Sequence, residues 1–255
     1  MSRPVVLVTG AARRIGRTIA LHLASQGWDV AVHHRDSQAE AAETVAAAQA
    51  AGAHAEAFAA DLAIEAQCNA LLPAVLERFG RIDAVVNNAS LFEYDDIASF
   101  SHAAMDRAWR ANTAPAILLA RALHAAGGGV VVNLLDQKLW NPNPDYLSYT
   151  LSKAALEAAT TLLAQALAPS LRVCGVAPGV TLLSGEMSGG EFEAAHRMTP
   201  LQRSSTPLDV ARAVHFLLES PAITGTTLLV DGGQHLHAQP RDVMFLARQH
   251  LETKA

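Results

Sequence analysis

Short β-branched runs alternate with longer Ala- and Leu-rich helical patterns along the whole chain, and this alternation constrains the fold most. Continuously apolar strands separated by helices are typical of a parallel sheet that is covered on both faces. We therefore predict one α/β domain over residues 1–255, with a doubly wound sheet of about seven parallel strands. The expected strands are 5–8, 30–33, 55–59, 84–87, 130–134, 173–176 and 227–230, and the expected helices are 14–26, 38–51, 65–79, 102–125, 147–168 and 207–219.

Local signals mark two of the helix starts. Ser37 followed by Glu40 predicts a capping box, in which each side chain bonds the backbone N–H of the other residue. Thr206 followed by Pro207 predicts an N-cap and a proline at the first helical position.

Composition narrows the class of protein. With 51% apolar and 17% charged residues, the chain can bury a sizeable core and differs from a disordered chain. The net charge of −5 lacks the basic footprint of a nucleic-acid or anionic-membrane binder. The start "MSRPVVLVTG" has no signal-peptide pattern, and no apolar run is long enough to span a membrane. We expect a soluble, cytoplasmic protein.

The cysteines and histidines do not suggest a metal site. Cys68 and Cys174 fit buried apolar positions of a reduced protein. The histidines are scattered, and the closest groups, His33-His34 and His235-x-His237, lack Cys or carboxylate partners at metal-ligand spacing. We expect no metal.

Two stretches interrupt the alternation. Residues 182–200 form a long, glycine-containing insertion after the sixth expected strand, which favours a substrate lid over a disordered loop. The tail, residues 234–255, reads as helical from Arg241. Docking on a neighbouring subunit, docking over the site and a solvated tail all remain open for it.

A strand, a glycine turn and a helix start follow one another in "VVLVTGAARRIGR". Gly10 allows the tight turn, and Gly16 allows close approach of the helix to the sheet, as in Rossmann-type folds. The N-terminus of the helix, at Arg14 and Ile15, can then offer free N–H groups to a pyrophosphate. We predict a dinucleotide site here.

The end of the second strand selects the dinucleotide. NAD enzymes place a carboxylate there for the ribose 2′-OH, whereas NADP needs positive charge. Here the strand ends in "VHHRDS", which puts His34, Arg35 and Ser37 at that point. A solvated Arg35 and a purely capping Ser37 are the alternatives, and Asp36 could imitate the NAD-type acid. Because a guanidinium binds phosphate in a bidentate manner and Arg14 adds a second, we favour NADPH.

Tyr149 and Lys153 are four residues apart in an expected helix and therefore share a face. An ammonium near a phenol lowers the pKa of the phenol, so we expect Tyr149 to donate a proton near working pH. Asn112 lies three residues before Pro115, which cannot donate to the carbonyl of Ala111, so the helix should kink there.

These motifs resemble the short-chain dehydrogenases/reductases over residues 5–233, including "APG" at 177–179 and "VDGG" at 230–233. Within that family, "TGAARRIG", "HHR", "NNASLF" and Asp136 in place of serine are most similar to the pteridine reductases. The resemblance implies that Asn112 anchors a water chain toward Lys153, and that Phe92 stacks on a pterin ring while Tyr146 lines the pocket. It also implies a homotetramer. The further cofactor positions that it implies are Asp61, Leu62, Asn88, Ala89, Ser90, Tyr149, Lys153, Pro178 and Gly179, with Arg14 and Ser90 also reaching the substrate.

Asp136 separates the possible reactions. An ionised carboxylate would repel the alkoxide that forms when a ketone is reduced. Reduction of a cyclic C=N bond needs a proton on nitrogen instead, which Asp136 and Tyr149 could relay. We therefore expect NADPH-dependent reduction of a dihydropterin or dihydrofolate-like small molecule. The alternatives are a general carbonyl reductase, a non-catalytic NADP(H)-binding sensor and, for Asp136 itself, a strand-end cap that points away.

Overall fold

The computed structural model describes residues 2–183 and 187–253 and contains one seven-stranded parallel sheet. Its order is β3-β2-β1-β4-β5-β6-β7, the doubly wound topology expected from the sequence. The strands are β1 Val5–Val8, β2 Asp29–His34, β3 Ala55–Ala59, β4 Ala84–Asn87, β5 Gly129–Leu134, β6 Leu171–Pro178 and β7 Thr227–Val230. All seven expected strands are confirmed.

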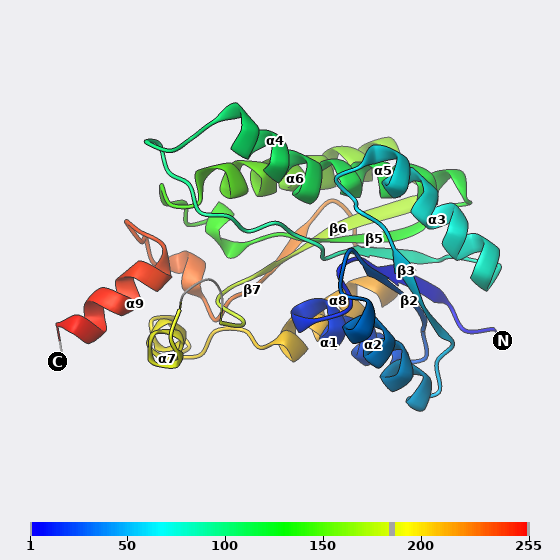
Figure 1. Cartoon of the computed structure of the whole chain (residues 1–255), viewed down its shortest axis with the longest axis horizontal. Helices are drawn as coiled ribbons and strands as arrows, with labels where there is room; N and C mark the ends of the chain where they lie inside the picture. Colours follow the sequence, from blue (N-terminus) through cyan, green and yellow to red (C-terminus); the bar gives the residue numbers. More distant parts are fainter. Residues whose placement is uncertain (1, 184–186, 254–255) are drawn as a thin grey trace.

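Helices cover both faces of this sheet, as Figure 1 shows. On one face lie α1 (Arg14–Ser25), α2 (Gln38–Ala50) and α8 (Pro207–Glu219); on the other lie α3 (Glu65–Phe79), α4 (His102–Asn112), α5 (Ala114–Ala125) and α6 (Leu147–Ala166). Side chains alternate along each strand, so Val6 and Val8 of β1 enter one core while Val5 and Leu7 enter the other.

The expected helix 102–125 is two helices. α4 ends at Asn112, Thr113 separates the two, and α5 begins at Ala114 with Pro115 in its first turn. Pro115 has no N–H to donate, so the helix breaks where a kink was predicted. Of the two predicted helix starts, Thr206 and Asp209 form the full capping box, whereas the Ser37 box is wrong because that side chain caps nothing.

The predicted lid and tail are both partly helical. Residues 189–197 of the 182–200 segment form α7 (Gly189–Arg197), and the tail contains α9 (Val243–Glu252). The two helices contact each other at the end of the molecule opposite the N-terminus (Figure 1). The tail therefore docks on its own chain. Residues 184–186 of the predicted lid lie outside the described residues.

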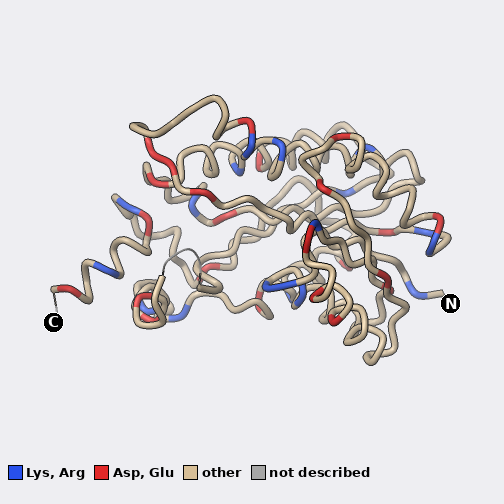
Figure 2. The backbone as a smooth tube through the Cα atoms, in the orientation of Figure 1, with Lys and Arg blue, Asp and Glu red and all other residues tan. Residues whose placement is uncertain are grey.

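Charge is spread over the molecule. In Figure 2, acidic residues (red) and basic residues (blue) are interspersed along the described part of the chain. None of the described helices has the length and apolar character that a membrane crossing requires.

Candidate active site

A cavity of about 800 Å³ opens at the carboxyl ends of the central strands, where the strand order reverses between β1 and β4. Its walls come from the turn after β1, the ends of β2, β4, β5 and β6, and the start of α9. Of the residues predicted for the site, all but Asn112 and Tyr146 line this one cavity: Gly10, Arg14, Ile15, Gly16, His34, Arg35, Ser37, Asp61, Leu62, Asn88, Ala89, Ser90, Phe92, Asp136, Tyr149, Lys153, Pro178 and Gly179.

The turn after β1 requires both glycines. Gly10 has a φ of +63°, a left-handed value that side chains disfavour. A Cβ on Gly16 would lie 2.3 Å from the carbonyl oxygen of Gly10 and 2.5 Å from Nδ2 of Asn88. The start of α1 can therefore approach the turn only because Gly16 has no side chain, which leaves its N–H groups facing the cavity.

Arg14 stands where a middle glycine would otherwise be, and its φ of 54° is also left-handed. Its Nη2 donates to the carbonyl oxygen of Leu183, at 2.8 Å, in the segment predicted as a lid. Arg14 thus ties the glycine turn to the far wall of the cavity, a contact that the sequence did not suggest.

His33 is a structural part of the glycine turn that sequence reasoning missed. The N–H of Gly10 donates to its Nδ1, at 3.0 Å, and its Nε2 lies 3.0 Å from the carbonyl oxygen of Ala60. This arrangement needs a neutral imidazole with the proton on Nε2. Burial lowers the pKa of His33 to about 4, which keeps it in that form.

The end of β2 carries the residues predicted to distinguish the 2′-phosphate of NADP from the ribose 2′-OH of NAD. The Arg35 Nε donates to the adjacent Asp36 carboxylate, at 2.6 Å, while most of the Arg35 side chain remains exposed. The His34 side chain is buried, and its Nδ1 has no hydrogen-bond partner among the described residues. The exposed guanidinium of Arg35 is the group at this strand end that can bind an anion.

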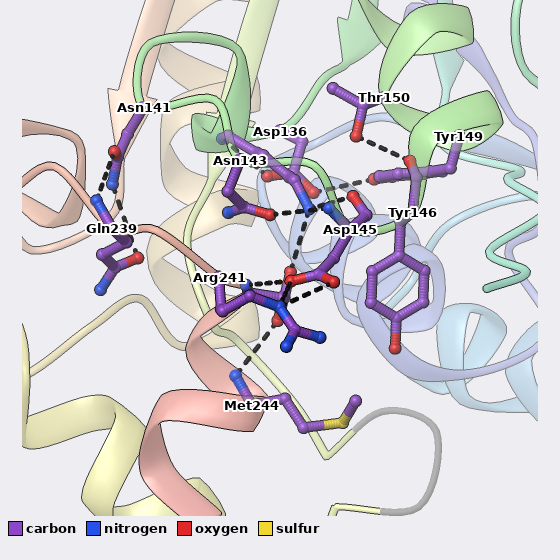
Figure 3. Close-up of polar contacts among 12 residues, drawn as sticks. Asp136, Asn141, Asn143, Asp145, Tyr146, Tyr149, Thr150, Gln239, Arg241 and Met244 are labelled. Atoms are coloured by element: carbon purple, nitrogen blue, oxygen red, sulfur yellow. Dashed lines mark hydrogen bonds and ion pairs between the residues drawn. The ribbon is translucent and has the colours of Figure 1, made fainter. Parts of the chain in front are cut away.

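Tyr149 and Asp136 meet inside the cavity. The Tyr149 hydroxyl donates to Oδ2 of Asp136, at 2.8 Å (Figure 3). The other carboxylate oxygen, Oδ1, accepts the backbone N–H of Lys138, at 2.9 Å, and so caps the short 3-10 helix η1 (Gln137–Leu139). Asp136 therefore caps the strand end but faces the tyrosine, so the alternative of a cap that points away is wrong.

The pKa values of this pair differ from the sequence expectation. Burial and the neighbouring Asp136 carboxylate raise the pKa of Tyr149 well above its usual value, whereas we expected Lys153 to lower it. Lys153 does not contact the phenol oxygen; its Nζ donates to the carbonyl oxygen of Leu134, at 2.7 Å. Burial lowers the pKa of Lys153 to about 8 and raises that of Asp136. Tyr149 is thus held as a protonated phenol, a donor rather than a base.

Asn112 lies outside the cavity wall but holds part of it. Its Oδ1 accepts the N–H of Leu91, at 2.7 Å, and its Nδ2 donates to the Leu91 carbonyl, at 3.0 Å, and to Oγ of Ser152, at 2.9 Å. This clamp fixes the segment that carries Ser90 and Phe92. Asn112 therefore clamps the backbone that follows β4, and its role in anchoring a water chain toward Lys153 stays a prediction.

Two stacked aromatic rings lie beside Tyr149, and one of them, Phe92, lines the cavity. The rings of Phe92 and Tyr146 are stacked, with centroids 4.2 Å apart, and the Phe92 ring lies edge-on to Tyr149 at 4.7 Å. Phe92 remains 40% exposed and lines the cavity, so a flat ligand can reach it. Tyr146 is buried behind it.

Asp95 is a second residue that the sequence did not identify. Its Oδ1 accepts the N–H of Ser148, at 2.9 Å, and its Oδ2 accepts the Ser148 hydroxyl. A carboxylate that contacts the first turn of α6 satisfies a free N–H and interacts favourably with the positive end of the helix dipole. Asp95 therefore fixes the start of the helix that carries Tyr149.

Comparison with known proteins agrees with this geometry. A family profile described as Enoyl-(Acyl carrier protein) reductase matches residues 10–235. A short-chain type dehydrogenase/reductase of Picea abies is 34% identical over 90% of this chain and 92% of its own length. The chain belongs to the short-chain dehydrogenase/reductase family. It is an oxidoreductase that uses a nicotinamide dinucleotide.

Two further family members are similar over nearly the whole chain. Pteridine reductase 1 of Leishmania tarentolae is 33% identical over 91% of this chain and 96% of its own length. The crystal structure of FolM alternative dihydrofolate reductase 1 from Brucella canis, complexed with NADP, has 40% identity and a TM-score of 0.89, covering 94% of this chain and 97% of that chain.

Proposed function

We propose that this protein is an NADPH-dependent reductase of pteridines, acting on the C=N bond of a dihydropterin or dihydrofolate-like substrate. The observation that carries the proposal is the hydrogen bond between the Tyr149 hydroxyl and the Asp136 carboxylate inside the cavity. Similarity to a pteridine reductase and to an alternative dihydrofolate reductase supports the same substrate class.

The residues present fit NADPH. The N–H groups at the start of α1 would hold the pyrophosphate, and Arg35, next to His34 in the cavity wall, would hold the 2′-phosphate, because its exposed guanidinium carries positive charge. Lys153, with its ammonium buried in the cavity wall, would bind ribose hydroxyls. When bound, the cofactor supplies the hydride for the reduction.

The protein's own groups would supply the proton. The raised pKa of Tyr149 means that the phenol keeps its proton next to the Asp136 carboxylate, to which it donates. When hydride adds to the carbon of a C=N bond, negative charge develops on the nitrogen, which can then accept this proton. Tyr149 would donate the proton, and Asp136 would hold the Tyr149 hydroxyl in place. A ketone oxygen would instead develop negative charge near Asp136, so the carboxylate favours imine reduction.

A panel of substrates tests the proposal. Oxidation of NADPH would be followed with 7,8-dihydrobiopterin, dihydromonapterin, dihydrofolate and simple ketones. Turnover of at least one pteridine with kcat/KM well above that of every ketone is the expected result. Turnover of ketones alone would make this a general carbonyl reductase. In an Asp136→Ser variant, pteridine activity should fall while ketone activity rises.

The cofactor preference has a separate test. Replacing Arg35 by alanine should weaken NADPH more than NADH, by about tenfold or more in KM, because only NADPH carries the 2′-phosphate. Equal use of both cofactors by the unaltered protein would contradict this assignment. A homotetramer stays a prediction, which sedimentation or light scattering would test.

A further inference from the structure

The C-terminal segment brings a second carboxylate to the wall of the catalytic cavity. Asp242 precedes α9 as its N-cap, lines the same cavity as Tyr149 and Asp136, and has a side chain that is only 20% exposed. Its Oδ2 lies 3.3 Å from Nζ of Lys138, a residue 104 positions earlier whose side chain is 4% exposed. An ion pair from the tail therefore lies in the cavity wall.

This ion pair is anchored at both ends. Lys138 Nζ also donates to the carbonyl oxygen of Asp145, at 2.6 Å, and the Asp145 carboxylate accepts Nε of Arg241, at 2.8 Å, and the N–H of Asp242, at 2.7 Å. Figure 3 shows Arg241 beside Asp145, close to Asp136. The two charges are thus held at fixed positions, and partial burial leaves them less screened than a surface pair.

Lys138 also connects the tail to the reacting pair. Its backbone N–H donates to Oδ1 of Asp136, and Oδ2 of the same carboxylate accepts the Tyr149 hydroxyl. The charged and titratable groups that face Asp136 come from three elements: Lys138 of η1, Tyr149 and Lys153 of α6, and Asp242 of α9. Lys138 lowers the pKa of Asp136, whereas Asp242 raises the pKa of both Asp136 and Tyr149.

We propose that Lys138 and Asp242 are positioning residues whose opposite charges set the protonation of the Asp136–Tyr149 pair, so that the C-terminal segment is part of the reducing site. Both charges act on the proton donor, which would serve a pteridine and a ketone alike. This role can therefore fail or succeed independently of the proposed substrate class.

Two charge-removing variants test this. Asp242→Asn keeps an N-cap acceptor for the Met244 N–H but removes the negative charge. The pKa values of Asp136 and Tyr149 should therefore fall. The alkaline midpoint of the kcat/KM profile should move down by about half a pH unit or more. Lys138→Met removes the positive charge and should move the same midpoint up by a similar amount. The profile is measured with 7,8-dihydrobiopterin, or with a ketone if only ketones are turned over.

Opposite shifts are the signature of an electrostatic role. Two controls accompany them: Lys138→Arg should keep the midpoint of the unaltered protein, and so should Asp83→Asn, which changes a carboxylate that accepts a backbone N–H and pairs with Arg81 at the other end of the sheet. Lower activity with unchanged midpoints, or shifts in the same direction, would overturn the proposal. If Lys138→Met does not fold, the downward shift in Asp242→Asn decides the question alone.

Discussion

The two ends of the cavity are built differently. At the cofactor end, neighbouring strand ends hold the glycine turn: Gly10 bonds His33, and the Asn88 side chain donates to the carbonyl oxygens of Thr9 and Gly10. At the substrate end, the loop after β5 is held by the tail, through Asn141 on residues 237–239 and Asp145 on Arg241 and Asp242.

Because of this difference, we expect substitutions at the two ends of the cavity to have different effects. The cofactor end depends on the absence of side chains and on backbone groups within the sheet, so its failures are steric and affect folding. The substrate end depends on charged side chains brought from distant segments, so its failures are electrostatic and affect chemistry. Four experiments test whether the two ends of the cavity respond in these different ways.

The largest effect is expected at the substrate end. Replacing Tyr149 by phenylalanine removes the proton donor and should lower kcat by about 10²- to 10⁴-fold, with a much smaller change in NADPH affinity. Steady-state kinetics and fluorescence titration of NADPH give the two numbers. A comparable loss in both would show that Tyr149 mainly shapes the cofactor site.

Acid should weaken the cofactor end through His33. Its folded-state pKa of about 4 lies below the usual 6.5, so its contribution is fully present above pH 6.5 and is lost as the pH falls through about 4. The loss is on the order of 3 kcal/mol. Urea unfolding at a series of pH values measures it, and a His33→Gln variant should show a flatter dependence in that range. Equal slopes for the two proteins would assign the acid sensitivity to other groups.

The next largest effect is expected from a methyl group added at the glycine turn. Gly16→Ala places a Cβ 2.3 Å from a backbone oxygen, which should cost about 1–3 kcal/mol of stability and weaken NADPH binding. Thermal unfolding and NADPH titration report both effects. Gly189→Ala is the matched control, because its added Cβ would meet no atom within 4 Å beyond its chain neighbours and the backbone of its own helix. Similar losses in both variants would contradict a steric role for the turn.

The smallest effect concerns the start of α6. Asp95→Ala removes the group that satisfies the N–H of Ser148 and should cost about 1 kcal/mol of stability. It should also lower kcat, because the first turn carries Tyr149. Ser101→Ala removes the comparable cap of α4 and should match the stability loss with kcat unchanged. An unchanged kcat in Asp95→Ala would limit that residue to folding.

Local patterns predicted much of this molecule. The seven strands, the glycine turn and the Tyr149–Lys153 face follow from spacing within a few residues of each other. The direction of Asp136 toward Tyr149 was expected only from spacing together with the family resemblance. Three hydrogen bonds join segments that are far apart in the chain, so no local pattern indicates them. They link Arg14 to Leu183, Gly10 to His33, and Lys138 to Asp242. The direction of the Tyr149 pKa was wrong because it depends on burial and on which charge lies nearer.

The packing of α9 also bears on how the protein is handled. Val243, Met244 and Ala247 belong to one apolar cluster with Tyr146, Tyr149 and Met187. An affinity tag or a surface attachment at the carboxyl end would extend from a helix that packs in the same apolar cluster as Tyr149, whereas the amino end lies at the opposite side of the molecule (Figure 1). Attachment through the amino end should therefore leave the active site unperturbed.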